Sequence, residues 1–527
     1  MTNFTGMPDE EVVVIVARNL SQAPPTPSIY AARLATEYAA TATDAHKKGL
    51  GQFFTPASLG AYLASLATFT GTEVRLLDPG FGAGILACSL IEHLVQTNPV
   101  LTTIHLDAYD IDTGVLPYAQ DALDYLTQWL GSKGITLHAH LFDEDFILAQ
   151  EADWQLFPLM PITPRYDIVI ANPPYFKIGN EDPRNLLMSR RQLEQRNIYA
   201  LFVVKAVLLT HPDGELLFLI PRSFCSGLYF EQFRAFLYQY LRFEQFHLFH
   251  SREHAFENAV LQENIIFKAT RVDGASKLNY SLHISSSTGT QDLTTANQLH
   301  CTLHQIVDFN SREKALFLPT TPVELTLISD FKTWGHRLID FSIEVSTGPV
   351  VAFRTRPFLR EKARKGRVPL FWIEHVRRGV IDWPNNGARH QYLAPVKDKP
   401  TSLLPIRNYV LLRRFSAKDD KHRLIAAPFF AAKWSSYETV GFENKLNYLY
   451  IRNGQLSEAR TAGLAALLNS DLYNTFFQIF NGNTQVSATE VRALPMPPIA
   501  MIEYIGQQVL DKGLEAVDSI VNEVLKH

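Results

Sequence analysis

The chain has 527 residues and a mass of 59.6 kDa, which is more than one ordinary domain holds, so we expect two domains. Apolar residues make up 46% of the sequence and charged residues 19%, and this balance excludes a largely disordered chain. The formal net charge of -4 does not by itself indicate a nucleic-acid partner.

The cysteines and the N-terminal segment indicate the cellular compartment of the protein. Cys88, Cys225 and Cys301 are far apart and form no CxxC pair, which argues against a disulfide framework and a structural zinc site. The apolar run from Val12 to Ala17 is too short for a membrane helix and lacks the basic start of a secretory signal. We therefore expect a soluble cytoplasmic protein with no metal and no membrane contact.

About the first 315 residues alternate short apolar runs with helical patterns, which predicts an α/β fold with a mostly parallel sheet. A helical pattern covers Gly84 to Val95, and the Ser-, Thr- and Gln-rich segment Ser285–Asn297 is predicted to be a loop or an insertion. Four runs are predicted to be buried strands: Val74–Leu77, Ile104–Tyr109, Ile168–Ile170 and Leu216–Ile220.

From about Thr320 the pattern changes to basic, aromatic and Asn-rich segments, and the last ~70 residues again have helical spacing. We predict a first domain over residues 1–315, with a short helical extension over 1–45, and a second α+β domain over 316–527. Between Val351 and Val380, basic residues far outnumber the two acidic ones, as is typical of a polyanion site; a solvated charged surface is the alternative. The basic residues are Arg354, Arg356, Arg360, Lys362, Arg364, Lys365, Arg367, Arg377 and Arg378.

A glycine-rich loop follows the first predicted strand. Gly80, Gly82 and Gly84 let the backbone pass close to a ligand, and no GxxxxGK[ST] lysine accompanies them, so a P-loop is not expected. Asp110 stands at the end of the next strand, where a carboxylate can accept hydrogen bonds from both hydroxyls of a ribose. These features predict a nucleoside cofactor, and dinucleotide oxidoreductases share them.

The most informative segment is a buried strand that runs directly into Asn172, Pro173, Pro174 and Tyr175. The Asn172 side-chain oxygen and the Pro173 carbonyl can accept both N–H bonds of an amine on an aromatic ring, and the prolines make the turn rigid. Tyr175 can then stack on that ring. The alternative interpretation of Asn172 to Tyr175 is a surface loop or a ligand for a proline-recognition domain. The position of this turn directly after an aliphatic strand argues against that interpretation.

With these motifs in this order, the sequence resembles the gamma class of adenine-N6-specific DNA methyltransferases, the Taq-type enzymes and their Eco57I-family relatives. The resemblance covers nearly the whole chain, from Gly51–Pro56 to Gly482–Val486, with Gly80-Phe81-Gly82 as a small departure in the glycine loop. It implies that the residues contacting S-adenosylmethionine are Phe54, Thr55, Pro56, Asp78, Gly80, Gly82, Asp110, Ile111, Asp145, Phe146 and Asn172. It also implies that Phe256 provides a second aromatic side chain that stacks on the base.

The resemblance implies a Rossmann-like domain that transfers a methyl group to N6 of a flipped-out adenine in double-stranded DNA. Residues 316–527 would recognise the target sequence, with Arg354, Arg356, Arg413 and Arg414 as candidate DNA contacts. It also implies that the protein is the modification half of a type II restriction–modification system, with a separately encoded endonuclease as a possible partner. The implied protein is a monomer in the bacterial cytosol, associated with the nucleoid.

Three alternatives stay open at this point. A fused nuclease would need a Pro-Asp followed by (Asp/Glu)-x-Lys, but Pro8-Asp9 and Pro212-Asp213 have no such partner at a suitable distance. An RNA or protein methyltransferase would share the Asn-Pro-Pro-Tyr turn but generally lacks a C-terminal domain of this size. A DNA-binding module that has lost activity would not be expected to keep Asn172 to Tyr175 and Asp110.

Overall fold

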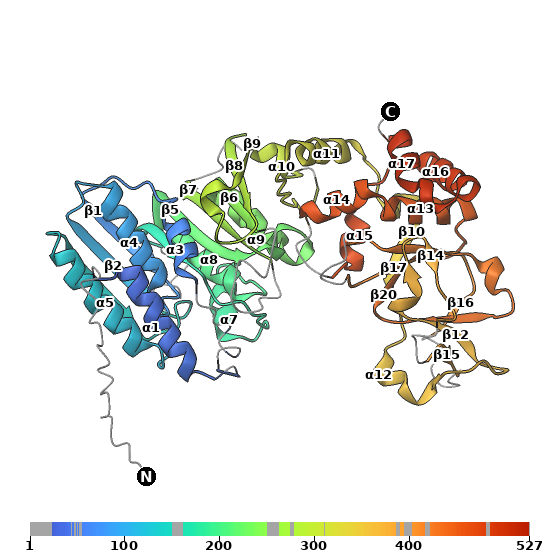
Figure 1. The fold of residues 1–527 in the computed structure, drawn as a ribbon, viewed down its shortest axis with the longest axis horizontal. Helices are drawn as coiled ribbons and strands as arrows, with labels where there is room; N and C mark the ends of the chain where they lie inside the picture. Colours follow the sequence, from blue (N-terminus) through green and yellow to red (C-terminus); the bar gives the residue numbers. More distant parts are fainter. Residues whose placement is uncertain are drawn as a thin grey trace, which may run out of the picture.

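A computed structural model of the protein describes residues 24–43, 45–46, 49, 51, 55–149, 162–249, 263–273, 279–309, 311–385, 390–394, 403–416, 422–480 and 485–525. Phe54 and Phe256, which are predicted to contact the cofactor and the flipped base, lie outside these residues. The described residues form two lobes that lie side by side, an N-terminal lobe in blue to green and a C-terminal lobe in yellow to red (Figure 1).

The N-terminal lobe is an α/β unit whose helices and strands alternate over most of its length. Its elements are α1 (Pro27–Thr41), α3 (Ala57–Ala64), β1 (Glu73–Asp78), α4 (Ile85–Thr97), β2 (Thr103–Tyr109), α5 (Leu116–Gly131), β3 (Thr136–Phe142), β4 (Tyr166–Ala171), α7 (Pro183–Ser189), α8 (Ile198–Leu209), β5 (Thr210–Pro221), α9 (Glu231–Tyr240), β6 (Leu241–Phe249), β7 (Asn264–Arg271), β8 (Ser281–Ser287), β9 (Asn297–Thr302) and α10 (Leu303–Ile306). All four predicted strands and the helix after the glycine loop are confirmed.

Within the described residues these strands form one nine-stranded sheet in the order β3-β2-β1-β4-β5-β7-β6-β8-β9. The strands from β3 to β5 pair in parallel, and β7 is antiparallel to both of its neighbours. The predicted mixed, mostly parallel sheet is therefore confirmed. The chain moves outward from β1 to β2 and β3 and then returns to the other side of β1 with β4, so the strand order reverses between β1 and β4.

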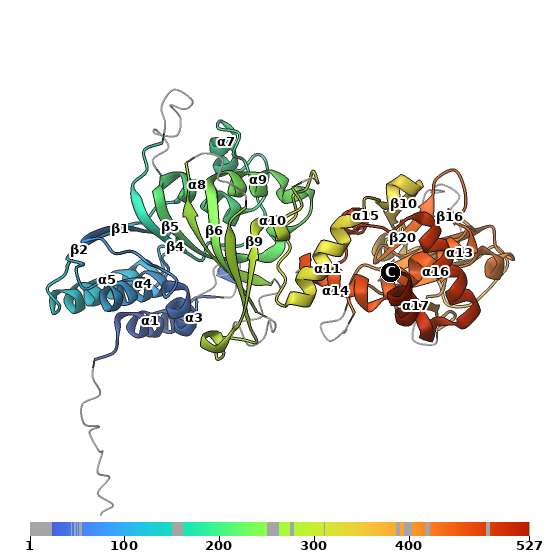
Figure 2. The same ribbon diagram turned by 90° about the horizontal axis from the view of Figure 1, so that it is seen from above.

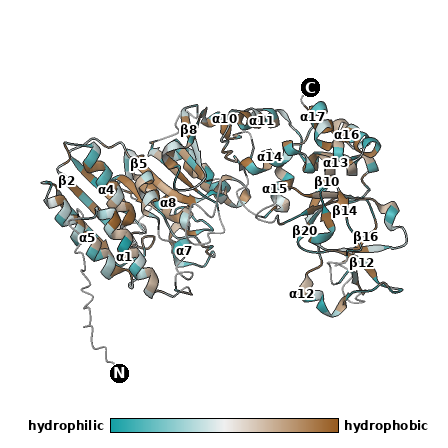
Figure 3. Cartoon of the chain, in the orientation of Figure 1, coloured by the Kyte–Doolittle hydropathy of each residue, from teal (hydrophilic) through white to brown (hydrophobic). Residues whose placement is uncertain are grey.

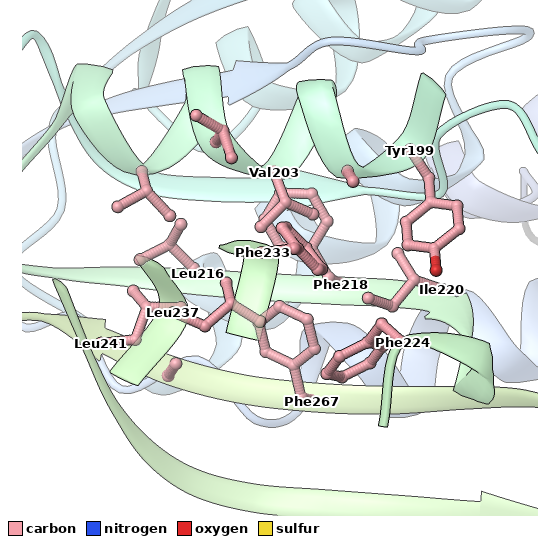
Figure 4. Packing of buried hydrophobic residues seen from close by; sticks show 14 of the residues in the cluster. Tyr199, Val203, Leu216, Phe218, Ile220, Phe224, Phe233, Leu237, Leu241 and Phe267 are labelled. Atoms are coloured by element: carbon pink, nitrogen blue, oxygen red, sulfur yellow. The ribbon is translucent and has the colours of Figure 1, made fainter. Parts of the chain in front are cut away.

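Helices cover both faces of the sheet. Figure 2 shows α1, α3, α4 and α5 on one face and α7, α8 and α9 on the other. Alternate side chains of a strand enter two different cores, since Leu217 packs with α4 while Phe218 packs with α8. The hydropathy colouring places apolar residues on the strands and on the inner faces of the helices (Figure 3). In Figure 4, Val203 of α8 lies over the β5 side chains.

The segment Ser285–Asn297 was predicted to be a loop or an insertion, and this prediction is confirmed for residues 288–296 but is wrong at both ends of the segment. Residues 285–287 end strand β8, and Asn297 begins strand β9, which pairs with β8 in antiparallel fashion. Polar side chains are tolerated inside this strand because His247 satisfies them: its ring nitrogens lie 2.8 Å from Ser285 Oγ and 2.9 Å from Ser287 Oγ. A loop remains only between the two strands.

The C-terminal lobe is α+β, as predicted. Its helices are α11 (Pro322–Thr333), α12 (Ala352–Thr355), α13 (Glu458–Asn469), α14 (Asp471–Phe480), α15 (Ala488–Ala493), α16 (Ile499–Lys512) and α17 (Val517–Leu525). Its strands are β10 (Ile343–Thr347), β11 (Leu359–Arg360), β12 (Val368–Phe371), β13 (Val376–Arg377), β14 (Val380–Ile381), β15 (Tyr392–Leu393), β16 (Leu404–Pro405), β17 (Tyr409–Arg413), β18 (Ala426–Phe429), β19 (Thr439–Phe442) and β20 (Leu446–Ile451). The described strands form small, largely antiparallel sheets, one of them ordered β10-β20-β17-β18.

Two glycines let α13 and α16 approach each other closely. A Cβ atom at Gly463 would lie 1.9 Å from the Ile502 carbonyl oxygen, and one at Gly506 would lie 1.7 Å from the Ala459 carbonyl oxygen. Real side chains never approach backbone this closely, so the crossing depends on the absence of a side chain at both positions.

The lobes are joined by contacts of cationic side chains with backbone carbonyls. Arg222, directly after β5, donates to the carbonyls of Gln478, at 3.3 Å, and Ile479 in the last turn of α14. A cation is favourable at that end of a helix because the helix dipole is negative there. On α11, Lys332 donates to three carbonyls at the C-terminal end of α10, those of His304, Gln305 and Val307.

No helix in the described part of the chain combines the length and the apolar character that a membrane span requires. The predicted absence of membrane contact otherwise stays a prediction.

Candidate active site

The candidate site lies where the strand order reverses, at the carboxyl ends of β1 and β4, the position at which open α/β sheets bind ligands. A cavity of about 280 Å³ opens between the loops that follow these two strands. Its lining residues include Thr55, Pro79, Gly80, Phe81, Gly82, Asp110, Ile111, Asp112, Glu144, Asp145, Phe146, Asn172, Pro174, Phe176, Arg184 and Phe202. The structure thus brings together most of the described residues that the sequence analysis proposed.

The glycine loop runs from the end of β1 to the start of α4 along one wall of the cavity. Its backbone is tied to β2, because the Phe81 N–H donates to the Tyr109 carbonyl at 2.9 Å. Gly82 and Gly84 have φ angles of 55° and 86°, which side chains make unfavourable. A Cβ atom at Gly80 would lie 3.7 Å from the Asn172 carbonyl oxygen, so this loop directly adjoins the Asn-Pro-Pro-Tyr turn.

Asp110 lies at the end of β2, as predicted. Its two carboxylate oxygens accept the backbone N–H of Gly82, at 2.8 Å, and of Asp112, at 2.9 Å. Burial raises the pKa of Asp110 above its usual value, and these two hydrogen bonds oppose the shift. Because each carboxylate oxygen can accept more than one hydrogen bond, both oxygens can still accept a ribose hydroxyl.

Asp78 lies at the base of the glycine loop, next to Pro79 and Gly80 of the cavity wall. Its side chain is completely buried, and its Oδ2 has no hydrogen-bond partner among the described residues. Burial, partly opposed by the Gly80 N–H, raises the pKa of Asp78 to about 7. A buried carboxyl with one unpaired oxygen fits a site for a positively charged ligand, and S-adenosylmethionine carries both a sulfonium and an ammonium group.

We therefore expect cofactor binding to depend on pH through Asp78. A cationic ligand favours the carboxylate, so below pH 7 the cofactor must expel a proton, and its affinity should fall by up to about tenfold per pH unit. Above pH 7 this dependence should level off. Titration calorimetry between about pH 5.5 and pH 7.5 measures the slope. Asp78→Asn should bind more weakly and lose the slope; an unchanged slope in that variant would assign it to another group.

The Asn172 side chain, directly after β4, is held at both ends. Its Nδ2 donates to Thr55 Oγ1 at 3.0 Å, and its Oδ1 accepts the hydroxyl of Tyr175. The same hydroxyl lies 3.0 Å from the carbonyl oxygen of Leu219 on β5. The amide oxygen of Asn172 is thereby identified as a hydrogen-bond acceptor beside the glycine loop.

Tyr175 is braced by the core that lies beneath it. Its ring meets the ring of Tyr199 edge to face, with centroids 6.3 Å apart, and Tyr199 lies at the start of α8. Burial raises the pKa of the Tyr175 hydroxyl well above its usual value, so this group is a proton donor throughout the working pH range. Its hydroxyl therefore donates to Asn172, although its predicted role is stacking on a base.

Asp145 and Phe146 lie in the cavity wall opposite the turn. Asp145 forms an ion pair with Arg184 of α7, with Nε 2.6 Å from Oδ2. Lys205 of α8 is 1% exposed and donates to the carbonyls of Phe146, at 2.7 Å, Ile147, at 3.2 Å, and Ala149, at 2.7 Å. The fully buried ammonium thus fixes the loop that presents the Phe146 ring to the cavity.

Sequence reasoning missed several residues at this site. Arg184, Phe176 and Phe202 line the cavity, and Lys205 supports it, but these residues follow the turn in ordinary helical or loop patterns. The signal that could have found Lys205 is a single charge within an otherwise apolar helix. Asp112, which accepts hydrogen bonds from Tyr38, His46 and Gly114, also lines the cavity.

The four candidate DNA contacts lie in the C-terminal lobe, away from this cavity, and they differ in their surroundings. Arg354 and Arg356 are exposed, and no residue of α12 is buried. Arg413 donates to the carbonyl of Val376 at 2.6 Å, and Arg414 donates to that of Asn444 at 2.6 Å. The first pair is therefore more accessible to a phosphate than the second. In the described part of the chain, no group of three or more His, Cys, Asp or Glu residues could hold a metal ion.

A sheet with this strand order, a glycine loop after β1 and an Asn-Pro-Pro-Tyr turn after β4 define an S-adenosylmethionine-dependent amino-methyltransferase. The family model of the Eco57I restriction-modification methylases matches residues 132–256. The chain is 32% identical to the type II methyltransferase M.BsuBI of Bacillus subtilis, over 91% of this chain and 95% of that protein. It is 31% identical to M.PstI of Providencia stuartii, over 90% of this chain and 93% of that protein.

The chain belongs to the type II DNA methyltransferases of restriction–modification systems, and within them to the adenine-N6-specific gamma class. The predicted resemblance and the predicted class of reaction are confirmed. Among solved structures, the type IIL restriction-modification enzyme MmeI in complex with DNA has a similar fold, with a TM-score of 0.52 at 12% identity, over 94% of this chain and 74% of that one.

Proposed function

We propose that Asn172, Pro173 and Tyr175 carry out this methylation on an adenine that has been flipped out of double-stranded DNA. The observation that carries the proposal is the position of the Asn172 amide. It lies in the wall of the cavity that the glycine loop and Asp110 also line, with its oxygen as the acceptor. A base amine held there adjoins the residues that fit the cofactor.

The role of the turn is orientation. The lone pair of an exocyclic amine is delocalised into the ring, which makes the amine a poor nucleophile. Asn172 Oδ1 and the Pro173 carbonyl accept its two N–H bonds and draw the nitrogen toward tetrahedral geometry, with its lone pair directed into the cavity. S-adenosylmethionine supplies an electrophilic methyl group on a sulfonium. Neither acceptor is a strong base, so the proton that N6 loses passes to water.

The remaining residues of the cavity are assigned to cofactor binding. Asp110 would accept the ribose hydroxyls, Ile111 and Phe146 would contact the adenine of the cofactor, and Asp78 would balance its positive charge. Asp145 would contact the exocyclic amine of the cofactor. Its carboxylate would then be shared between the cofactor and Arg184, because Arg184 already forms an ion pair with Oδ2. Thr55, Gly80 and Gly82 complete the wall, while Pro56, which was also predicted to contact the cofactor, follows Thr55 and is not among the lining residues. We propose no metal ion in the reaction.

Tyr175 forms a hydrogen bond in the structure and is proposed to stack on the base during the reaction. Its hydroxyl occupies Asn172 Oδ1, the same acceptor that the proposal assigns to the adenine amine. The Tyr175 side chain must therefore move away from Asn172 before its ring can stack on the base, and Asn172 Oδ1 is then left to the amine.

Tyr175→Ala should lower the single-turnover rate of methylation by about ten- to a hundredfold, because stacking on one aromatic face contributes about 1–3 kcal/mol. Tyr175→Phe keeps the ring and removes only the competing hydroxyl, so it should retain most of the rate. Rates measured on a duplex with one target adenine compare the two variants. A phenylalanine variant as slow as the alanine variant would show that the hydroxyl, and not the ring, is needed.

The C-terminal lobe is assigned to recognition of the target sequence, with residues 1–315 as the catalytic domain and 316–527 as the recognition domain. Arg354 and Arg356 would contact phosphates, which makes DNA affinity decrease with salt, while Arg413 and Arg414 remain candidates for DNA contact. We propose that the enzyme acts as a monomer on chromosomal DNA at the bacterial nucleoid, beside a separately encoded endonuclease.

Expression in a bacterial host that lacks DNA methylation, followed by mapping of modified adenines across the genome, tests the proposed function. The expected result is N6-methyladenine within one short recurrent sequence. Purified protein with labelled S-adenosylmethionine should transfer label to duplex DNA and not to tRNA or to release factors. Label in RNA or protein would replace the proposal with the corresponding alternative, and cleavage of plasmid DNA with Mg²⁺ would revive the fused nuclease.

A further inference from the structure

We propose that Thr55 is a positioning residue for methyl transfer, whose hydroxyl fixes the Asn172 amide so that its oxygen, and not its nitrogen, faces the amine. The inference rests on the function proposed above. It differs from the role predicted for Thr55 from the sequence, which is contact with the cofactor.

The two ends of a carboxamide have nearly the same shape and opposite hydrogen-bonding properties. Which end faces a substrate is therefore decided by the partners of the amide. At Asn172 the Nδ2 end donates to Thr55 Oγ1 at 3.0 Å, while the Oδ1 end accepts the Tyr175 hydroxyl. When Tyr175 turns away to stack on the base, it no longer orients the amide, and Thr55 keeps it in the same orientation.

The orientation matters because adenine N6 has two N–H donors. A reversed Asn172 amide would place its own N–H bonds against them, which leaves donors facing donors in a poorly hydrated site. The base could still enter and stack, but its nitrogen would not be drawn toward tetrahedral geometry. The defect would therefore appear chiefly in the rate of transfer, because the lost interaction acts on the reacting nitrogen, and affinity for the cofactor would not change.

The local fold holds Thr55 rigidly. Its side chain is 6% exposed, and the next residue, Pro56, stands at the start of α3, where its carbonyl accepts the N–H of Leu59, at 3.0 Å, and of Gly60, at 2.9 Å. Gly60 in turn lies against α4, since a Cβ atom there would be 3.0 Å from Ser89 Oγ. The segment that carries Thr55 is thus packed, through α3, against α4, the helix that starts at the glycine loop.

Three variants of the full chain separate orientation of Asn172 from contact with the cofactor. Thr55→Val keeps the shape and removes the acceptor, Thr55→Ser keeps the hydroxyl, and Thr55→Ala removes the acceptor without a branched side chain. Thr97→Val is the matched control, because the Thr97 hydroxyl only contacts its own helix at the surface. Single-turnover rates at saturating cofactor, the Kd for S-adenosylmethionine, and base flipping by 2-aminopurine fluorescence are measured for each variant.

The expected result for Thr55→Val is a rate lowered by roughly tenfold, the value of one hydrogen bond in a transition state, with cofactor Kd and base flipping within about twofold of the wild type. Thr55→Ser and Thr97→Val should match the wild type. If Thr55→Val does not fold, Thr55→Ala must show the same result, a lowered rate with unchanged cofactor Kd and base flipping. A normal rate, or a weakened cofactor Kd with a normal rate, overturns the inference. Wild-type protein that leaves duplex DNA unmodified instead overturns the proposed function.

Discussion

Asn172→Ala should lower the rate of methyl transfer by about a hundred- to a thousandfold, the effect expected when one preorganised polar group that acts on the reacting atoms is removed. The alanine variant retains the Pro173 carbonyl as a single acceptor, so the base can enter, but the second N–H bond of its amine has no partner. The nitrogen then keeps its planar geometry and remains a poor nucleophile.

The measurement is the single-turnover rate on a duplex that carries one target adenine, with cofactor Kd and thermal stability as controls. Cofactor affinity should be largely retained, because the glycine loop, Asp78 and Asp110 are unchanged. Stability should change little, since Asn172 lies at the edge of the cavity and is not part of either core. Turnover at the wild-type rate would remove Asn172 from the mechanism.

The largest effect on stability is expected from Gly506→Ala. A methyl group there would lie 1.7 Å from the Ala459 carbonyl oxygen, and because the obstacle is backbone, the two helices must separate. Overpacking of a close-packed core costs about 1–3 kcal/mol, and we expect the upper end of that range, about 3 kcal/mol. The first transition in thermal or urea unfolding should therefore move to milder conditions.

Gly131→Ala is the matched control for this substitution. Gly131 also lies in a helix, the end of α5, but a Cβ atom there would have no atom within 4 Å. The control should be neutral or slightly stabilising, since alanine favours a helix by about 1 kcal/mol over glycine. Equal destabilisation by both variants would show that loss of backbone freedom, and not the crossing of α13 and α16, is responsible.

The parts of the fold that the sequence predicted are those in which local pattern and tertiary structure agree. The runs around Val74, Ile104, Ile168 and Leu216 are rich in apolar residues because these strands pack against helices, and each became a strand of the sheet. The glycine loop and the Asn-Pro-Pro-Tyr turn were recognisable for the same reason, because their backbone conformations require particular residues.

The parts that could not be predicted depend on partners distant in the sequence. Ser285 and Ser287 resemble loop residues, and only His247 on a neighbouring strand makes them suitable for a buried strand. Lys205 would be expected at a surface until the carbonyls of the Phe146 loop are known. The contact between Thr55 and Asn172 joins residues more than a hundred positions apart and has no local signal.

The Arg222 contact between the lobes constrains how a new target specificity can arise. Arg222 is 9% exposed and donates to the carbonyls at the end of α14, while the strand that precedes it, β5, carries the Leu219 carbonyl that accepts the Tyr175 hydroxyl. If the C-terminal lobe reads the target sequence, as proposed above, a joint of this kind would keep the spacing between the base pairs that are read and the base that is modified constant. Natural variants should therefore acquire different target sequences by exchanging side chains on the surface of the C-terminal lobe, while the angle between the lobes stays the same.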